Sequence, residues 1–175
     1  SGNVGEIDGI KYKIAGAVKD KMDIVLVSPY NYEDAKIIVK ALKGGHSGID
    51  IGDASRLNAA KLIADLLSKF PQGAYYSNEN GVITSCNLGA IVAGGIQNSV
   101  ASIVEKGIKT NDYISEIMKK SSTNIINVLA MASYSIRSAS VEKENELKSL
   151  MQSLVKEFNE QNKELAEATI EFEVH

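Results

Sequence analysis

Apolar residues recur along the chain with two periods, and the shorter period predicts β-strands. Several short segments combine β-branched residues with an alternation of apolar and polar positions, which is typical of half-buried strands. These segments are residues 35–42, 82–92, 128–137 and 169–174. In the last of them acidic and apolar side chains alternate, so that strand is expected to have one acidic and one apolar face.

The longer period predicts two helices. The first is expected to begin at Asp53, a good N-cap residue, and to end before Pro71, which cannot continue a helix. Its apolar stripe consists of Leu57, Ala60, Ala64, Leu67 and Phe70. The second is expected to begin at Ser140, with glutamates near its positive end. Its buried stripe consists of Leu147, Leu150, Met151, Leu154, Val155 and Phe158.

Taken in chain order, these elements predict an α+β fold. The order β-α-β-β-α-β is that of a ferredoxin-like two-layer sandwich, in which two main helices cover one face of an antiparallel sheet. Residues 1–34 contain short apolar runs separated by glycine and charge, and they are expected to be a linker. Residues 35–175 are then the folded domain, with two short helices over residues 99–120 as an extra helical elaboration.

The amino-acid composition argues against several classes of function. The 175 residues carry a net charge of −3 without a basic cluster, so neither a nucleic acid nor a membrane is an expected partner. The single cysteine, Cys86, fits a reducing, cytoplasmic compartment and is typical of a core residue rather than a catalytic thiol. Two histidines, His46 and His175, are too few for a zinc site, so no metal ligands are expected in this chain.

The sequence Gly44-Gly45-His46-Ser47-Gly48 lies between the first predicted strand and the first predicted helix. An ordinary turn with a solvated histidine is one interpretation, and a phosphate-binding loop at a helix N-terminus is another. A Walker loop requires Gly-Lys-Ser/Thr at the helix start, and a dinucleotide site requires Gly-x-Gly-x-x-Gly. Neither pattern is present, so these five residues alone favour the ordinary turn.

The surrounding sequence changes that interpretation. The stretch from Leu42 to Gly48, followed by Asn58-Ala59-Ala60-Lys61-Leu62, resembles the lid, or dimerisation, domain of the di-zinc metallopeptidases. This family includes carnosinases, aminoacylases and carboxypeptidase G, and the similarity is greatest to the aminoacyl-histidine (Xaa-His) dipeptidases. Further matches are Gly81-Val82-Ile83-Thr84-Ser85-Cys86-Asn87-Leu88-Gly89 and Ser135-Ile136-Arg137-Ser138, so the resemblance runs roughly from Ala35 to Val174.

The resemblance implies that this chain and a larger catalytic domain have different functions. In the family that domain carries both zinc ions, and the lid, inserted within it, forms a twofold homodimer. His46 would stabilise the oxyanion in the partner subunit's active site, while Gly44, Gly45 and Gly48 let the loop turn sharply. Arg137 is expected to bind the carboxylate of a dipeptide substrate, or else to pair with a surface acid. Asn98 is a weaker candidate for substrate binding, because the sequence around it lacks the family's arginine and proline.

Two hypotheses therefore stand at the level of sequence. The first is a non-catalytic lid and dimerisation segment of a cytoplasmic zinc dipeptidase, a hydrolase whose activity belongs to the whole enzyme. The second is a stand-alone ferredoxin-like domain that senses a small amino acid or an anion through its glycine loop. Zinc uptake, peptide hydrolysis and saturable small-molecule binding by the chain alone separate the two.

Overall fold

The computed structural model describes Lys19, residues 30–94 and residues 123–174. Within these residues a five-stranded sheet has the strand order β3-β4-β6-β1-β7, and a two-stranded sheet pairs β2 with β5. The strands are β1 (Asn31–Ala41), β2 (Gly45–His46), β3 (Gly73–Asn78), β4 (Gly81–Gly94), β5 (Ile125–Ile126), β6 (Leu129–Ser138) and β7 (Ala166–Val174). The helices are α2 (Ala59–Leu67) and α5 (Val141–Gln161).

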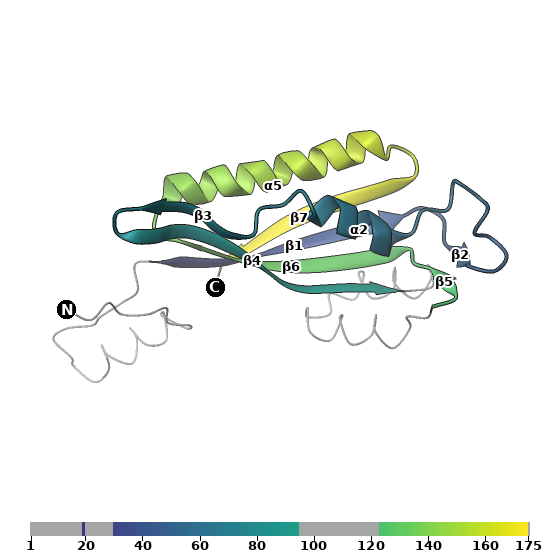
Figure 1. Ribbon diagram of the computed structural model, residues 1–175, viewed down its shortest axis with the longest axis horizontal. Coiled ribbons are helices and arrows are strands. Elements are labelled where there is room, and N and C mark those ends of the chain that lie inside the picture. The colour runs from purple at the N-terminus through teal and green to yellow at the C-terminus, as the bar shows by residue number, and fades with distance from the viewer. Residues whose placement is uncertain (1–18, 20–29, 95–122, 175) are drawn as a thin grey trace.

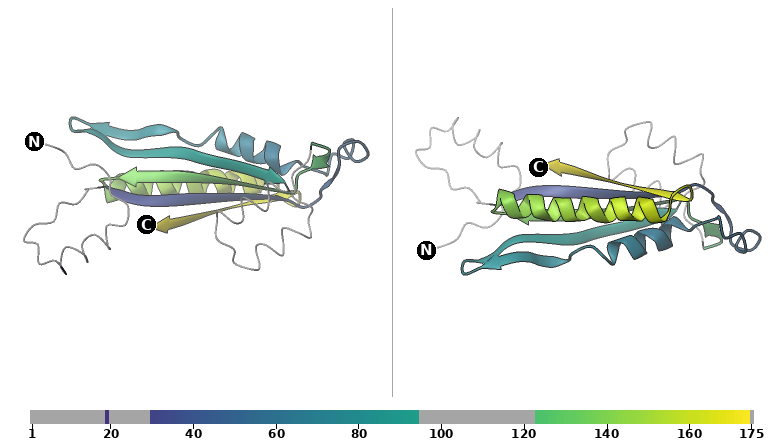
Figure 2. Two further views of the ribbon diagram at one scale, coloured as in Figure 1. Left: turned by 90° about the horizontal axis from the view of Figure 1, so that it is seen from below. Right: turned by 90° about the horizontal axis from the view of Figure 1, so that it is seen from above.

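Every neighbouring pair of strands is antiparallel, and both helices lie on the same face of the large sheet (Figure 1). The longer helix α5 packs on β7 and β6, whereas α2 packs on β6, β1 and β4. The right-hand view of Figure 2 shows the two helices side by side in front of the strands. The α+β class and the antiparallel sheet with two helices on one face are therefore as the sequence predicts.

The core lies between the helices and the sheet. Along β1, alternate residues such as Ile37 and Val39 are fully buried, because successive side chains of a strand point to opposite faces. They meet Ile63 of α2 and Leu147 and Met151 of α5, each completely shielded from solvent. Burying a large apolar side chain contributes about 1.5–3 kcal/mol, so this layer is the main source of stability.

The predicted N-cap residue is correct for one of the two helices and wrong for the other. Ser140 is the N-cap of α5, as predicted, and its side chain accepts a hydrogen bond from the Lys143 N–H. The prediction of Asp53 as the N-cap of α2 was wrong, because that cap is Asn58, whose Oδ1 accepts from the Ala60 N–H. The Asp53 carboxylate instead accepts hydrogen bonds from Ser55, so a turn occupies the segment where a helix was expected.

The buried stripe of α5 includes most of the predicted residues but not Leu150. Leu147, Met151 and Phe158 are buried, whereas Leu150 is 38% exposed. A carboxylate, Glu144, is buried instead, one turn before Lys148. The burial of Glu144 is tolerated because the Lys148 ammonium lies 3.5 Å from its carboxylate.

Two features of the fold have no counterpart in the predicted elements. The first is the hairpin between β3 and β4, in which Gly73 and Gly81 adopt positive φ angles of 84° and 107°. The second is the pairing of β2 with β5, which turns the residues around His46 from a loop into a short strand. The proposed helices over residues 99–120, Asn98, and most of the linker lie outside the described residues. β1 begins at Asn31, so residues 31–34 of that linker lie in the sheet.

Candidate functional site

His46 lies in β2, beyond the end of the large sheet, on the connection from β1 to α2 (Figure 1). β2 is anchored by its pairing with β5, in which His46 faces Ile125. A backbone hydrogen bond from the Ser47 N–H to the Asn124 carbonyl, at 2.9 Å, extends this pairing. The histidine is thus held by backbone contacts on both sides although it belongs to a protruding segment.

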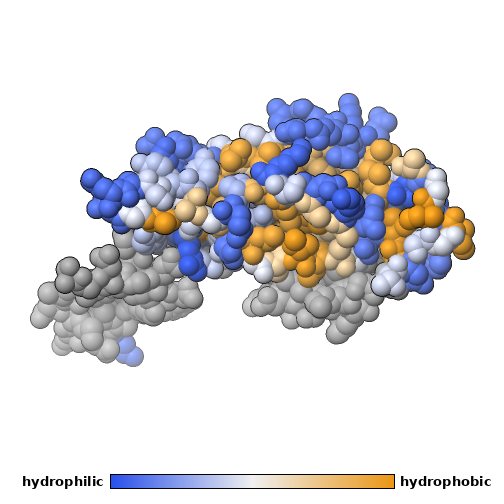
Figure 3. Space-filling model, in the orientation of Figure 1, coloured by the Kyte–Doolittle hydropathy of each residue, from blue (hydrophilic) through white to orange (hydrophobic). Residues whose placement is uncertain are grey.

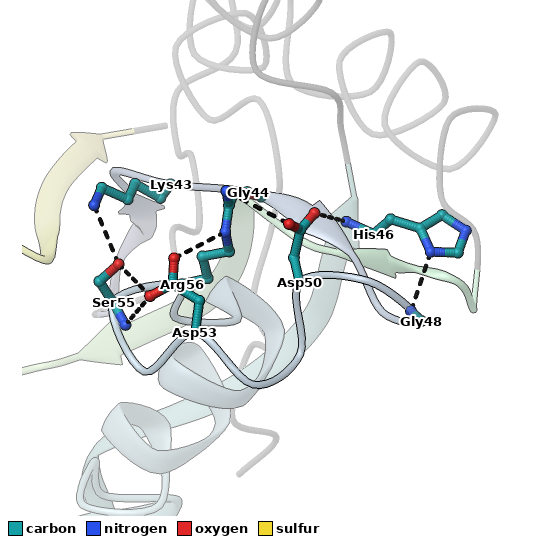
Figure 4. Close-up of polar contacts among 8 residues, drawn as sticks. All are labelled: Lys43, Gly44, His46, Gly48, Asp50, Asp53, Ser55 and Arg56. Atoms are coloured by element: carbon teal, nitrogen blue, oxygen red, sulfur yellow. Dashed lines mark hydrogen bonds and ion pairs between the residues drawn. The ribbon is translucent and has the colours of Figure 1, made fainter.

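Asp50 closes the turn that follows His46. Its backbone N–H donates to the His46 carbonyl at 2.8 Å, and its side-chain Oδ2 accepts from the His46 N–H at 2.9 Å. Both polar groups of the His46 backbone therefore bind the same residue (Figure 4). Such a closed turn fixes the direction in which the imidazole leaves the backbone.

Arg56 ties this turn to the segment before α2. Its guanidinium contacts the Asp50 carboxylate at 3.5 Å and the Asp53 carboxylate at 3.1 Å, and it donates to the Gly44 carbonyl. Hydrogen bonds from the Ser55 hydroxyl and N–H hold the pKa of Asp53 below its ordinary value, so Asp53 stays charged beside Arg56. Figure 4 shows Arg56, Asp53 and Asp50 grouped beside the loop that carries His46. The sequence analysis missed Asp50 and Arg56, although two acids and an arginine soon after the glycines were a visible signal.

Steric closeness explains two of the loop glycines. A Cβ added to Gly44 would collide with the Val128 side chain, and one added to Gly45 would lie 2.7 Å from Asp50 Oδ2. Gly48 has more room, since its added Cβ would lie 3.2 Å from the edge of the His46 ring. The first two glycines therefore let the turn pack tightly against β5 and Asp50, without a positive φ.

The imidazole of His46 is exposed and makes two polar contacts. The Gly48 N–H donates to Nδ1 at 3.0 Å, and the side-chain nitrogen of Asn124 lies 3.4 Å from Nε2. The Nε2 side of the ring faces outward from the turn (Figure 4). A histidine in this setting offers one nitrogen to a ligand and keeps the other engaged with the backbone.

Apolar side chains surround this polar turn. Ile49 is 83% exposed and Ile51 is 70% exposed, and Leu42 at the end of the preceding strand is also exposed. The space-filling view shows hydrophobic surface at the end of the molecule that carries β2 (Figure 3). Large apolar side chains grouped on a protruding loop are typical of a surface that a partner covers.

The other candidates lie away from this turn. Arg137 is near the end of β6, where it faces Tyr32 of β1, and its guanidinium lies 5.4 Å from the Tyr32 ring centroid. Eight residues of strand separate Leu129, at the His46 end of β6, from Arg137, which corresponds to about 27 Å. The structure therefore does not bring Arg137 and His46 of one chain together.

Cys86 belongs to the core, as the sequence suggests. It is 2% exposed on β4, and its Sγ lies 3.1 Å from the Pro71 carbonyl. Burial raises the pKa of the thiol to about 11, so it is not a nucleophile at neutral pH.

Within residues 30–94 and 123–174, no three His, Cys, Asp or Glu side chains are grouped as a metal site. No helix among the described residues is long and apolar enough to cross a membrane.

No protein-family model and no curated protein matches the chain. Solved structures do match its fold. An aminopeptidase, PepT, from Bacillus cereus superposes with a TM-score of 0.55 at 19% identity, over 83% of this chain and 29% of its own. A tripeptidase from Staphylococcus aureus gives 0.53 at 17% identity, over 83% and 29%. An aminobenzoyl-glutamate utilization protein from Klebsiella pneumoniae gives 0.51 at 14% identity, over 83% and 28%.

These matches define the fold as one that occurs as a segment of larger proteins. The chain spans less than a third of the length of each of these three structures. At such identities the likeness concerns the arrangement of helices and strands, not the chemistry.

Proposed function

We propose that this chain is the lid and dimerisation domain of a zinc-dependent dipeptidase, and that it has the ferredoxin-like topology. The observation that carries the proposal is the combination of a shared fold with a protruding, braced histidine. The fold recurs as less than a third of peptidase and hydrolase chains, and His46 stands on a tip whose apolar residues are exposed. A tip of this kind is suited to insertion into another domain.

The proposed chemistry of His46 is stabilisation of negative charge. Amide hydrolysis places negative charge on the carbonyl oxygen, and a pre-positioned hydrogen-bond donor lowers the energy of that state. Two zinc ions in the catalytic domain would polarise the same carbonyl and activate water. The contacts of Asp50 and Arg56 hold the turn in place, which reduces the reorganisation needed when the charge develops.

The placement of Arg137 supports a twofold arrangement. His46 and Arg137 lie at opposite ends of the sheet, so one small dipeptide cannot touch both within a single chain. An antiparallel pairing of two β4 edges over residues 90–94 would run the two sheets in opposite directions, so the protruding His46 segment of one chain would extend along the other sheet toward its Arg137 end. We therefore assign His46 and Arg137 of one active site to different subunits of a homodimer.

Replacing His46 in the whole enzyme tests the proposal. His46→Ala is expected to lower turnover by roughly two to three orders of magnitude, because one oxyanion donor is lost. The metal content and the sedimentation of the dimer should not change, and His46→Gln, which keeps a donor, should recover part of the rate. Turnover equal to that of the unsubstituted enzyme in His46→Ala would exclude the proposed role.

The chain alone provides a second test. It is expected to dimerise in sedimentation, to take up no stoichiometric zinc and to hydrolyse no dipeptide. Saturable binding of a free amino acid or an inorganic anion by the isolated chain would instead favour a sensing domain.

A further inference from the structure

The two contacts of the His46 ring cannot both be hydrogen bonds as the atoms stand. A neutral imidazole has one protonated nitrogen, which donates, and one with a lone pair, which accepts. The Gly48 N–H and the Asn124 side-chain NH₂ are both donors, and they approach Nδ1 and Nε2 respectively. One of the two nitrogens must therefore carry a hydrogen that faces a donor.

The backbone contact decides which nitrogen that is. The Gly48 amide can only donate, and its distance of 3.0 Å to Nδ1 is that of a normal hydrogen bond. Its orientation is fixed by the turn that Asp50 closes around His46. The lone pair therefore lies on Nδ1, and the hydrogen lies on Nε2.

A flip of the Asn124 side-chain amide makes it compatible with the Nε2–H tautomer. A rotation of its side chain by 180° exchanges Oδ1 and Nδ2, which have almost the same shape. With Oδ1 toward the ring, Asn124 accepts a hydrogen bond from Nε2–H, and the longer distance of 3.4 Å makes this the weaker contact. It is therefore the contact that a better acceptor displaces.

We propose that Gly48 and Asn124 are positioning residues that present His46 as an Nε2–H hydrogen-bond donor. The chemical consequence is selectivity for acceptors. The outward nitrogen has no lone pair, so it meets a carbonyl or carboxylate oxygen and is not available as a metal ligand. The tautomer is a property of this chain, whereas the identity of the oxygen as that of a scissile carbonyl rests on the proposed function.

Nitrogen NMR of the ¹⁵N-labelled chain tests the inference directly, because the sequence holds only two histidines, His46 and His175. Long-range proton–nitrogen correlation distinguishes a protonated from an unprotonated ring nitrogen, and the His46→Gln variant assigns the signals. At a pH where the rings are neutral, we expect the ratio of Nε2–H to Nδ1–H in His46 to exceed that of the urea-unfolded chain about tenfold. A ratio equal to the unfolded one, or a predominant Nδ1–H form, overturns the inference.

Three variants separate the contributions of the two positioning residues. Gly48→Ala keeps the N–H and should keep the tautomer, whereas Gly48→Pro removes the N–H and should return the ratio toward the unfolded value. Asn124→Ala should leave the tautomer unchanged but speed the exchange of the Nε2 hydrogen with water. If Asn124→Ala reverses the tautomer, Asn124 was the donor, and the inference is wrong even where Gly48→Pro fails to fold.

These results are independent of the test of function. Loss of turnover in His46→Ala together with an Nδ1–H ring would retain the catalytic role and remove the role of Gly48. The expected tautomer together with full turnover in His46→Ala would do the opposite.

Discussion

The two outer edges of the sheet differ in composition and in how they are covered. At one edge, residues 79 and 80 connect β3 to β4, and β3 pairs with β4 only up to Cys86. The β4 residues from Leu88 to Gly94 contain no charged side chain. At the other edge, β7 presents Glu167, Glu171 and Glu173 on the face away from the helices. Charged side chains on an edge strand discourage pairing with another chain.

The backbone of β7 is also partly capped. The Asn159 side chain accepts from the Ala168 N–H at 2.7 Å and donates to the Ala168 carbonyl at 2.9 Å, as a neighbouring strand would. On β4 the Gln72 side chain binds the Leu88 N–H, and a bulge follows between Leu88 and Ala90. Beyond that bulge Ile91 and Ala93 direct their backbone groups away from β6, and the Ile91 side chain is 48% exposed.

This difference indicates which edge is suited to association. An uncharged strand with outward backbone groups and an exposed isoleucine is a template for pairing, whereas β7 carries two features that oppose it. Among the described residues, the segment 90–94 of β4 is therefore the edge that we assign to the proposed homodimer. It also lies at the end of the sheet near His46, since Gly94 pairs with Leu129.

Proline substitution in the β4 edge gives the largest expected effect. Ile91→Pro removes an outward N–H of β4, and in a twofold contact the loss counts twice, so dimerisation should weaken by about 2–6 kcal/mol. The fold should survive, because an edge strand tolerates proline where its N–H faces solvent. Sedimentation velocity over a range of concentrations measures the change.

Ile170→Pro is the matched control on β7. Its N–H also points away from the sheet, two residues along from the capped Ala168, so the substitution should leave the dimer intact. Dissociation by Ile170→Pro but not by Ile91→Pro would reverse the assignment of the two edges.

The next effect concerns the charged cluster that holds α5 on the β7 side of the sheet. Lys148 Nζ lies 2.7 Å from Glu33 of β1, 3.5 Å from Glu144 and 5.2 Å from the Phe172 ring of β7. Lys148→Met would leave two buried carboxylates without their cation, at a cost of about 1.5–3 kcal/mol in the free energy of unfolding, the range for a hydrogen bond to a charged group. Lys143→Met is the control, because its partner Glu146 is far more exposed than Glu33 and Glu144, so loss of this pair should cost clearly less stability.

The same cluster predicts a dependence on pH. Burial lowers the pKa of Lys148, but the hydrogen bond and charge of Glu33 and the charge of Glu144 outweigh it and raise the pKa above 10.5. Because the folded pKa is raised, the stabilisation is complete below about pH 10.5 and is lost as the pH rises through the folded value. Urea unfolding of Lys148→Met should therefore lack the part of the alkaline destabilisation that belongs to this residue.

The sequence predicted the elements of the core better than it predicted the edges and the site. Long segments with one buried face, such as β1 and α5, have a strong period, because their buried residues recur at every second or every third to fourth position. The start of α2 was wrong because Asp53 and Asn58 are equally good caps in isolation, and the contact of the Ala59 N–H with the Asn127 carbonyl favours the later start. That contact joins distant parts of the chain, so no local pattern reports it.

The candidate site was likewise predicted only where the signal is local in the sequence. His46 stands out in the sequence because glycines flank it, but its partners Asn124 and Ile125 are far along the chain and meet it only through the pairing of β2 with β5. β3 was missed because its residues alternate only weakly and most are exposed, so its pairing with β4 depends on the turn at Gly81. Local periodicity records burial, whereas edges and turns depend on contacts that burial does not encode.

The smallest predicted effect tests the cap on β7. Asn159→Ala removes both hydrogen bonds to Ala168 and should lower the free energy of unfolding by about 1–2 kcal/mol. It should also expose the outer backbone of Ala168 while leaving the glutamates of β7 unchanged. Urea unfolding measures the loss of stability, and sedimentation measures any new association through β7.

If charge alone protects β7, the variant stays a dimer. If the cap is also required, species larger than the dimer appear with rising concentration, and Asn162→Ala, which alters a side chain bound to the Phe158 carbonyl, gives none. An unchanged stability in Asn159→Ala would show that solvent replaces the amide at no cost, and the contrast between the edges would then rest on charge.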